Sequence, residues 1–193
     1  MIVTFTNNKG GIGKTSLAVL LAESAIERGF PVSLYDLDKE QRNLTLLISA
    51  WDKEIAVDGE LPAKLPNDCL VIIDTPPALG EQTERAIKAA DVVVVPVDTS
   101  ITSITAVQKI SAINPRSRVI VAVNKYEQGS GYDRNVVEMY RKKINTTIIT
   151  VPRNRYIIVN LSQGYTWNYR MTETGQKAFL PLINAISNNG RWQ

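Results

Sequence analysis

A glycine-rich loop near the start of the chain contains the residues with the clearest chemistry. Lys9-Gly10-Gly11-Ile12-Gly13-Lys14-Thr15-Ser16 stands between a short apolar run and a stretch with helical spacing. Glycines let backbone N–H groups wrap a phosphate, and the start of a helix adds the positive end of its dipole. Lys14 supplies a positive charge to the β- and γ-phosphates, and the Thr15 hydroxyl suits Mg²⁺. The loop therefore predicts binding of a nucleoside triphosphate with Mg²⁺ through residues 9–16.

Three aspartates follow apolar runs and could complete such a site. Asp36 and Asp38 come after the run 32–35, and Asp74 comes directly after the run 70–73. An acidic residue at the end of an apolar strand commonly holds Mg²⁺ through water. Asp74 is therefore the first candidate for the metal, and Asp36 is expected to support the magnesium shell together with Thr15. Helix capping or a solvated turn is the alternative for Asp36 and Asp38.

The elements that must position these residues alternate between strands and helices. Short β-branched runs predict strands at 2–6, 32–35, 70–73, 92–96, 119–123 and 147–151. Helical spacing predicts helices at 14–28, 43–51, 81–89, 101–113, 131–144 and 172–186. Such alternation is typical of the α/β class, in which a mostly parallel sheet has helices on both faces and binds ligands at the carboxyl ends of its strands. We expect one domain over residues 1–193, with 58–68 as a surface connection.

Composition excludes several other classes of function. The chain has no histidine, which excludes Ser-His-Asp hydrolysis and zinc sites, and its single cysteine, Cys69, is expected to be a small buried hydrophobe. No apolar run approaches the roughly 20 residues of a membrane span, and the N-terminus shows no leader, so we expect a cytoplasmic protein. The net charge of +3 is too small to indicate a polyanionic partner by itself.

The pattern Lys-Gly-Gly-x-Gly-Lys-Thr at 9–15 resembles the ParA/MinD family of deviant P-loop ATPases. Asn8 stands where the usual phosphate loop begins with glycine, and the extra lysine, Lys9, occupies the family's signature position. In that family the extra lysine reaches across a dimer interface to the partner's nucleotide. The resemblance therefore implies a P-loop NTPase fold, an ATPase that takes ATP or ADP with Mg²⁺, and catalytic roles for Lys9 and Lys14. An exposed loop lysine is the alternative for Lys9.

Two further segments resemble the switches of the same family. Asp36-Leu37-Asp38 is similar to the first switch, in which the later aspartate helps to place the attacking water, so Asp38 is the expected hydrolytic residue. A carboxylate that orients water is sufficient, because transfer of the γ-phosphoryl group needs an in-line water more than a strong base. Asp74-Thr75-Pro76-Pro77 resembles the second switch. Family members usually continue Asp-Pro-Gln after the first switch, whereas here Lys39-Glu40 precedes Gln41, which leaves the place of Gln41 open.

Adenine is the expected base. Asn124-Lys125 is followed by Glu127 at the position where guanine-specific P-loop enzymes carry aspartate. In the resembling family the strand-end asparagine, here Asn124, lies by the adenine ring. Val151-Pro152-Arg153-Asn154 matches the family's Ile-Pro-Arg-Asn loop, which packs against the base and implies contacts from Pro152, Arg153 and Asn154. A turn cap at Asn124 and an ordinary loop at 152–154 are the alternatives.

The resemblance covers nearly the whole chain and is nearest to short ParA proteins, which lack an N-terminal helix-turn-helix domain. It implies an ATP-dependent homodimer that binds DNA nonspecifically and segregates plasmid or chromosomal DNA. Such a protein is cytoplasmic and associates with the nucleoid, and its partner is a ParB-like centromere-binding or cargo-adaptor protein. Basic residues could neutralise DNA phosphates: Arg141, Lys142, Lys143, Arg153, Arg155, Arg170, Lys177 and Arg191. A solvated basic helix end is the alternative for the first three.

Two other functions fit the same motifs. One is an ATP-dependent positioning factor for a protein or membrane-associated cargo, of the MinD-like or compartment-positioning kind. The other is a small-molecule enzyme such as a dethiobiotin-synthetase-like ligase, which needs a polar substrate pocket that the sequence does not reveal. The segment 178–186 is apolar, but it contains Pro181 and has only Lys177 as a nearby basic residue. We therefore expect a core helix there rather than a membrane-binding one.

Overall fold

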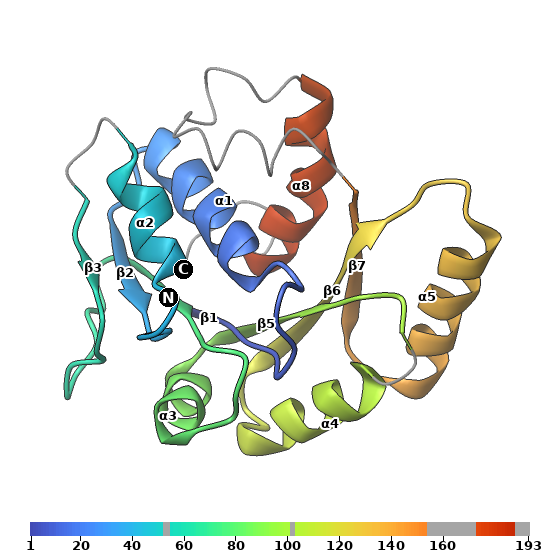
Figure 1. The fold of residues 1–193 in the computed structure, drawn as a ribbon, viewed down its shortest axis with the longest axis horizontal. Coiled ribbons are helices and arrows are strands. Elements are labelled where there is room, and N and C mark those ends of the chain that lie inside the picture. Colours follow the sequence, from blue (N-terminus) through green and yellow to red (C-terminus); the bar gives the residue numbers. More distant parts are fainter. Residues whose placement is uncertain (52–54, 101–102, 154–172, 188–193) are drawn as a thin grey trace.

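Parallel strands form the sheet of the computed structural model, which describes residues 1–51, 55–100, 103–153 and 173–187, with the backbone alone for 173–177. Within those residues the sheet has seven strands in the order β3-β2-β4-β1-β5-β6-β7 (Figure 1). Their bounds are β1 Ile2–Phe5, β2 Val32–Asp36, β3 Val57–Asp58, β4 Leu70–Asp74, β5 Val92–Val97, β6 Arg118–Tyr126 and β7 Thr147–Pro152. The predicted α/β class with a parallel sheet is confirmed.

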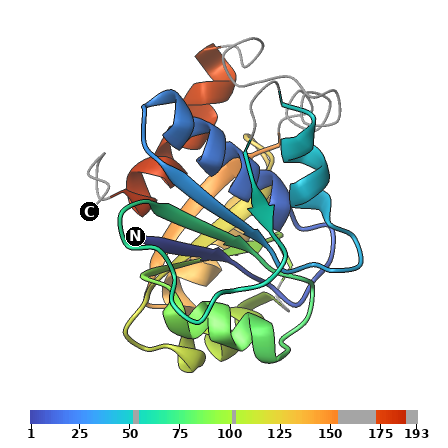
Figure 2. The same cartoon turned by 90° about the vertical axis from the view of Figure 1, so that its left-hand side faces the viewer.

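The helices cover both faces of the sheet (Figures 1 and 2). On one face lie α1 Lys14–Glu27, α2 Asn43–Ser49 and α8 Glu173–Ile186, and on the other lie α3 Glu81–Ala89, α4 Ser103–Ile113 and α5 Gly131–Lys143. Each helix returns the chain to the amino edge of the sheet, so that every strand ends at the same edge. Loops that follow the strands therefore gather at one end of the molecule.

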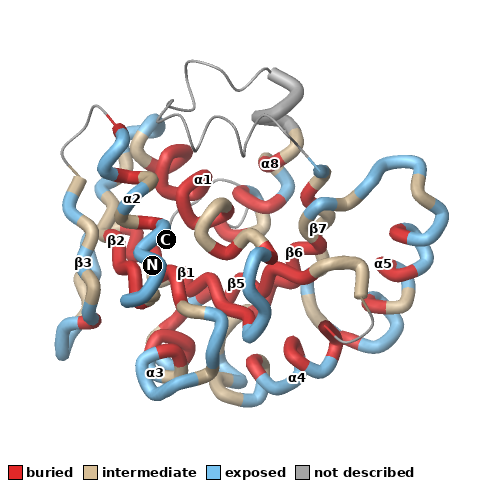
Figure 3. Tube along the Cα trace, viewed as in Figure 1, coloured by how far each residue is buried: buried red, intermediate tan, exposed pale blue. Residues whose placement is uncertain are grey.

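Strand β5 shows how the sequence produces this three-layered arrangement. Its valines alternate between the faces: Val92 and Val94 belong to the apolar cluster beneath α1 and α8, whereas Val93, Val95 and Val97 pack with α4 and α5. All six residues of the strand are buried, as Figure 3 shows for the centre of the sheet. A continuous β-branched run is the expected sequence for a parallel strand that is covered on both faces.

The register of three neighbouring strands brings their carboxyl ends level. Asp74 at the end of β4 is the register partner of Phe5 at the end of β1 and also of Asp36 at the end of β2. The phosphate loop leaves β1 immediately after Phe5. The register therefore places two strand-end aspartates beside that loop.

Two expectations about the loops need correction. The stretch 58–68 is not only a surface connection, because Asp58 ends the edge strand β3 and Leu61 is buried against Tyr35 and Val71. A two-residue strand has no period to detect, and its pairing with β2 is a tertiary contact. Cys69 is partly buried rather than buried, and it packs at the margin of the same cluster.

The last helix is a core helix, as predicted. The side chains of Phe179, Leu182, Ile183 and Ile186 are buried in the cluster that α1 covers. None of the described helices is both long enough and apolar enough to span a membrane.

Candidate functional site

The phosphate loop joins β1 to α1 in a tight backbone path. Gly11 and Gly13 have left-handed φ values of 66° and 100°, and Lys14 begins the helix. Alternation of such conformations turns successive N–H groups toward one side, which is the geometry that binds anions. The glycines are therefore needed for the shape of the loop as well as for close approach by a ligand.

A cavity of about 400 Å³ lies against this loop at the carboxyl edge of the sheet. Predicted site residues that line it are Gly10, Gly11, Gly13, Lys14, Thr15, Ser16 and Asp38. Residues that were not predicted as ligands also line it: Gln41, Asn43, Leu46, Leu47, Thr75 and Pro77. Ile12 is buried and is not among the described lining residues. The cavity thus brings the phosphate loop and both switch segments together.

Lys14 is a buried cation at the floor of this cavity. Its Nζ donates to the backbone carbonyl of Lys9 at 3.2 Å. Burial lowers the pKa of the Lys14 ammonium, and the nearby carboxylates of Asp74 and Asp38 oppose that shift. A positive charge held among acidic groups in a cavity is suited to a polyanionic ligand.

Thr15 and Asp74 form a pair that could hold a cation. The Thr15 hydroxyl donates to Asp74 Oδ2 at 2.5 Å, and Asp74 Oδ1 is buried with no hydrogen-bond partner among the described residues. Burial raises the pKa of Asp74 to about 7; the Thr15 hydrogen bond and Lys14 counter this, while Asp36 and Asp38 add to it. Within the described part of the chain, no group of three or more acidic, histidine or cysteine side chains could hold a metal by itself.

Asp36 holds the start of α2. Its Oδ2 accepts from both the backbone N–H and the hydroxyl of Thr45 at 3.0 Å, and its Oδ1 accepts from the N–H of Asp38 at 3.2 Å. This is the capping role that was the alternative for Asp36, supplied from a neighbouring strand end. A contribution of Asp36 to a magnesium shell stays a prediction.

Asp38 folds the first switch segment back on itself. Its Oδ1 accepts from the N–H of Gln41 at 3.0 Å, and both residues line the cavity. Lys39 is exposed and pairs with Glu60 at 2.6 Å. The insertion relative to the family pattern is thus absorbed as an exposed turn, and Gln41 reaches the cavity beside Asp38.

Lys9 is directed to a different partner outside the cavity lining. Its ammonium donates to Asp98 Oδ2, and the other oxygen, Oδ1, accepts from the hydroxyls of Ser100 at 2.6 Å and Ser103 at 3.0 Å. Burial alone would raise the pKa of Asp98, but the hydrogen bonds from Lys9, Ser100 and Ser103 and the charge of Lys9 lower it to about 2. Sequence reasoning missed Asp98, although it follows the buried run of β5 and the strand-end rule used for Asp74 applies to it equally.

A buried tyrosine on α5 holds the segment that contains Asp98. The hydroxyl of Tyr140, on α5, donates to the backbone carbonyls of Asp98 at 3.0 Å and Ser100 at 2.6 Å. Burial raises the pKa of Tyr140 to about 12, with the charge of Asp98 in the same direction and a hydrogen bond with Ser103 opposing it. The hydroxyl therefore remains a donor at neutral pH.

Asn124 and Lys125, at the end of β6, contact the phosphate loop itself. Asn124 Nδ2 donates to the carbonyl of Ile12, and Lys125 Nζ donates to the carbonyl of Gly11, both at 2.9 Å. Neither side chain is among the described residues that line the cavity. Contact of Asn124 with adenine stays a prediction.

The predicted base loop lies at the end of β7. Arg153 donates its backbone N–H to the carbonyl of Tyr126 at 2.9 Å and its guanidinium to Glu127 at 2.8 Å. Pro152 is the register partner of Tyr126, which places both loops next to each other at the carboxyl edge. Asn154 lies outside the described residues, as do Arg155, Arg170 and Arg191. Pro152 and Arg153 do not line the cavity, as far as the described residues define it.

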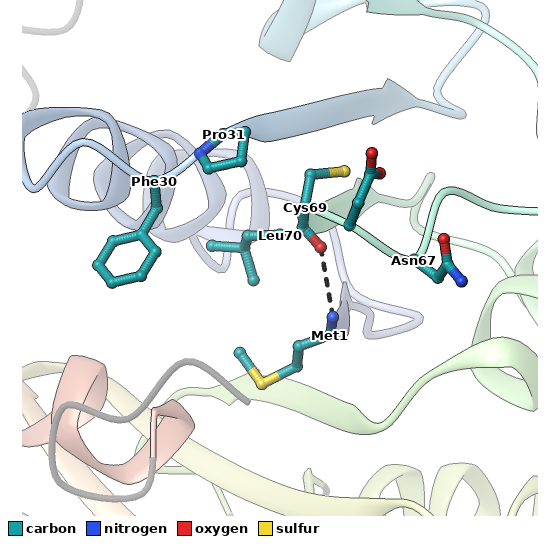
Figure 4. Close-up of a pocket in the computed structure, with 7 residues that line it drawn as sticks. Met1, Phe30, Pro31, Asn67, Cys69 and Leu70 are labelled. Carbon is teal, nitrogen blue, oxygen red and sulfur yellow. Dashed lines mark hydrogen bonds between the residues drawn. The ribbon is translucent and has the colours of Figure 1, made fainter.

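A second, smaller cavity of about 170 Å³ lies at the opposite, amino edge of the sheet (Figure 4). It is bounded by Met1, Phe30, Pro31, Asn67, Asp68, Cys69 and Leu70. The terminal amino group of Met1 donates to the carbonyl of Cys69 at 3.3 Å. Burial raises the pKa of the Cys69 thiol and Asp68 adds to this, so the group is a poor nucleophile.

A family model described as the CobQ/CobB/MinD/ParA nucleotide binding domain matches residues 3–166. Among curated proteins, the chain is 27% identical over 106 residues to a protein named ParA from Rhizobium radiobacter. That match covers 49% of this chain and 47% of the relative, so the chain spans about half the length of that protein.

Solved structures share the fold at low sequence identity. A variant of McdA from Cyanothece in complex with ATP is 14% identical, with a TM-score of 0.76 over 100% of this chain and 98% of that one. The septum site-determining protein MinD of Pyrococcus horikoshii, complexed with Mg-ADP, is 18% identical, with a TM-score of 0.74 over 96% and 95%. Cobyrinic acid a,c-diamide synthase of Mycobacterium smegmatis, with an ATP analogue and magnesium, is 19% identical, with a TM-score of 0.72 over 99% and 95%.

Proposed function

The chain belongs to the CobQ/CobB/MinD/ParA nucleotide-binding family, and we propose that it is a Mg²⁺-dependent ATPase that dimerises on ATP and binds DNA nonspecifically as a dimer. The observation that carries this proposal is the placement of two lysines from one loop. Lys14 is buried at the cavity, whereas Lys9 is half exposed and is not part of the described lining. One lysine is thus suited to the chain's own ligand, and the other is available to a ligand held by a second chain.

The phosphate loop and Lys14 are the proposed ligands of the nucleotide phosphates. Gly11 and Gly13 turn backbone N–H groups to one side, and α1 adds its dipole. ATP-, AMPPNP- or ADP-bound forms are described for structural neighbours, which supports an adenine nucleotide here. Asn124, Pro152, Arg153 and Asn154 are proposed to contact the base from the ends of β6 and β7.

Thr15 and Asp74 are the proposed Mg²⁺ ligands, with Asp36 behind them. The Thr15 hydroxyl, at the cavity lining, and the orphaned Oδ1 of the buried Asp74, to which Thr15 is hydrogen-bonded, are hard oxygen donors. When bound there, Mg²⁺ would neutralise charge on the phosphates. Burial raises the pKa of Asp74 although Lys14 opposes this, and a bound cation would favour the charged carboxylate further.

Hydrolysis is assigned to Asp38, with Gln41 beside it. Both residues line the cavity, and the hydrogen bond from the Gln41 N–H fixes the Asp38 carboxylate. Because phosphoryl transfer depends mainly on the position of the attacking water, a fixed carboxylate next to an amide side chain is sufficient. Lys14 stabilises the developing charge on the chain's own nucleotide, and Lys9 is proposed to do so on the partner's.

The proposed dimer binds DNA through contacts with the DNA phosphates alone. The basic residues do not share one face: Arg141, Lys142 and Lys143 end α5 at the amino edge of the sheet, whereas Arg153 follows β7 at the carboxyl edge. Arg141 also pairs with Glu138. Each phosphate contact that is lost should reduce the slope of log affinity against log salt by about 0.9.

The decisive experiment measures binding to random-sequence duplex DNA at stated salt with ADP, ATP or a slowly hydrolysed ATP analogue, together with the mass of the species. We expect DNA binding by a dimer only with ATP or the analogue. Lys9→Ala should abolish dimerisation and hydrolysis, whereas Lys88→Ala, an exposed ion-paired lysine on α3, should behave like the parent. A nucleotide-independent monomer without DNA affinity would overturn the proposal.

A second candidate is an ATP-dependent positioning factor for a protein cargo or a membrane-associated cargo. The similarity to McdA and MinD structures favours it, and the same cavity would serve it. A ParB-like protein and a cargo adaptor would be the respective partners. A pull-down with the dimer held by the slowly hydrolysed ATP analogue distinguishes the two candidate functions, because a partition ATPase should retain a centromere-binding protein. The structural similarity to cobyrinic acid a,c-diamide synthase keeps a small-molecule ligase as a third candidate, which ATP turnover without DNA or protein partner would favour.

A further inference from the structure

The end of β6 supports the phosphate loop through two side-chain hydrogen bonds to its backbone. Asn124 Nδ2 donates to the carbonyl of Ile12 and Lys125 Nζ donates to the carbonyl of Gly11, each at 2.9 Å. Gly11 and Gly13 line the cavity, whereas Ile12, Asn124 and Lys125 are not among its described lining residues. The loop therefore contributes residues to the cavity and also contacts the end of β6 through its backbone carbonyls.

These two hydrogen bonds orient the N–H groups of the loop. In a trans peptide unit the carbonyl oxygen and the following N–H point in opposite directions. A Gly11 carbonyl held toward Lys125 thus directs the N–H of Ile12 away from it, and an Ile12 carbonyl held toward Asn124 does the same for the N–H of Gly13. The two donors therefore favour the conformation in which both N–H groups point away from the end of β6.

The backbone of β6 is distorted where it supplies these donors. Its pairing with β7 is irregular between Val123 and Tyr126, and Lys125 has a left-handed φ of 58°. A lysine rarely adopts this conformation, and the surrounding structure must maintain it. Asn124 contributes to this, because its Oδ1 accepts from the N–H of Lys125 at 2.9 Å while its Nδ2 holds the loop.

Asn124 and the loop are also fitted closely to each other. A Cβ at Gly13 would lie 2.2 Å from Asn124 Nδ2, whereas one at Gly10 or Gly11 would meet nothing within 4 Å. Contact between β6 and the loop is therefore concentrated at the peptide units whose N–H groups would bind phosphate.

We propose that Asn124 and Lys125 are positioning residues for the phosphate loop, which they preorganise for the polyphosphate of the nucleotide. This inference rests on the proposed function and adds that both residues act on the phosphates through the loop. The base contact implied for Asn124 is a separate interaction. A preorganised set of N–H donors binds an anion without a cost for reorganisation, so loss of either donor should weaken phosphate binding.

The test uses inorganic triphosphate and ATP as two probes, each with Mg²⁺, in calorimetric titrations of the full chain. Lys125→Met removes the donor and keeps the apolar stem. It should lower the affinity for both probes by the same factor, about tenfold for the loss of a charged hydrogen bond. Lys125→Arg should restore most of the affinity. Lys109→Met, at an exposed lysine on α4, is the matched control and should bind like the parent.

Each outcome of these titrations decides the inference. Weaker binding of ATP with unchanged triphosphate binding would assign Lys125 to the base and overturn it, as would no change in either. If the parent binds neither probe, the nucleotide function and this inference fall together. In the absence of ligand, the amides of Ile12 and Gly13 should exchange hydrogen faster in Lys125→Met than in the parent. Equal exchange, at an equal unfolding temperature, would contradict the positioning role.

Discussion

Lys9 and Asp98 form an ion pair within one chain although they are 89 residues apart in sequence. Both are partly exposed, so the pair is accessible and breakable. In the proposed dimer, Lys9 must leave Asp98 to reach the partner's nucleotide. The strength of this pair therefore sets part of the free-energy cost of dimerisation.

Asp98→Asn should favour the ATP-bound dimer. An exposed ion pair is worth up to about 1 kcal/mol, so its loss should raise the dimerisation constant by up to about fivefold. Analytical ultracentrifugation with a slowly hydrolysed ATP analogue measures this change. Glu84→Gln, which breaks the exposed pair with Lys88 on α3, should leave the constant unchanged. Weaker dimerisation of the Asp98 variant would show that the carboxylate has another role.

The acid stability of the chain should depend on Asp98. Its pKa is lowered to about 2 in the native state, below the ordinary value near 3.9 in the unfolded chain. The native state therefore gains stability from this carboxylate above about pH 4 and loses it as the pH falls toward about 2. Denaturant unfolding from pH 5 to pH 2 should show the difference between parent and Asp98→Asn shrinking over this window. A constant difference would contradict the ion pair as its source.

Gly13→Ala should destabilise the protein, whereas Gly10→Ala should not. At Gly13 a Cβ would lie 2.2 Å from Asn124 Nδ2 and φ is 100°, but at Gly10 a Cβ would meet nothing within 4 Å. We expect a loss of roughly 1–3 kcal/mol in the free energy of unfolding for Gly13→Ala. Gly11→Ala, with a positive φ in open space, should fall between the two. Urea denaturation curves of the three variants test this order.

Tyr140→Phe should reduce the stability of the fold more than Tyr132→Phe, although both tyrosines are on α5 and donate to the same loop. The buried Tyr140 hydroxyl serves two carbonyls, while Tyr132 is 63% exposed and its hydroxyl donates to Thr99 at 3.1 Å. Without the buried hydroxyl the Asp98 carbonyl loses this partly buried hydrogen bond, whereas the Ser100 carbonyl still accepts from the N–H of Ser103, so we expect a cost of about 0.5–1.5 kcal/mol. The exposed substitution should cost less than about 0.5 kcal/mol. Equal shifts in the unfolding temperature would refute this assignment.

Asp74→Asn should have opposite effects without and with ligand. The native pKa of about 7 lies above the unfolded value, so stability from the protonated form is present below about pH 4 and is lost as the pH rises toward 7. At pH 8 the variant without nucleotide should therefore be more stable than the parent, by roughly 1–3 kcal/mol. With Mg²⁺ and ATP at about 100 times the Kd, the parent should gain about 2.7 kcal/mol and the variant much less. Thermal unfolding under both conditions supplies the comparison.

Local patterns predicted the framework of the molecule well. The observed helix at 81–89 has the predicted first and last residues, and the end of β5 was predicted within one residue. In both segments the local sequence pattern and the burial in the fold favour the same structure. The phosphate loop was recognisable because its glycines, lysine and threonine are adjacent in sequence. Strand β3 was missed, since a two-residue edge strand exists only through its pairing with β2.

Contacts between distant segments could not be predicted from these patterns. The partner of Lys9, Asp98, directly follows β5, and the donors that hold Gly11 and Ile12 come from β6. No periodic or local signal connects such residues; the register of the sheet brings them together. The capping of α2 by Asp36 is similar, because its side chain reaches Thr45 nine residues later across a turn.

The common register of β1, β2 and β4 also divides the chain into regions that differ in their tolerance to engineering. The described residues of the proposed site lie at or after the carboxyl ends of strands, whereas the connection from α4 to β6 turns at the amino edge, where Pro115 and Arg116 are exposed. A fluorescent reporter inserted between these two residues would leave the strand ends undisturbed. Movement of the protein in a living cell could then be followed with its cavity, its Lys9 and its loop supports intact.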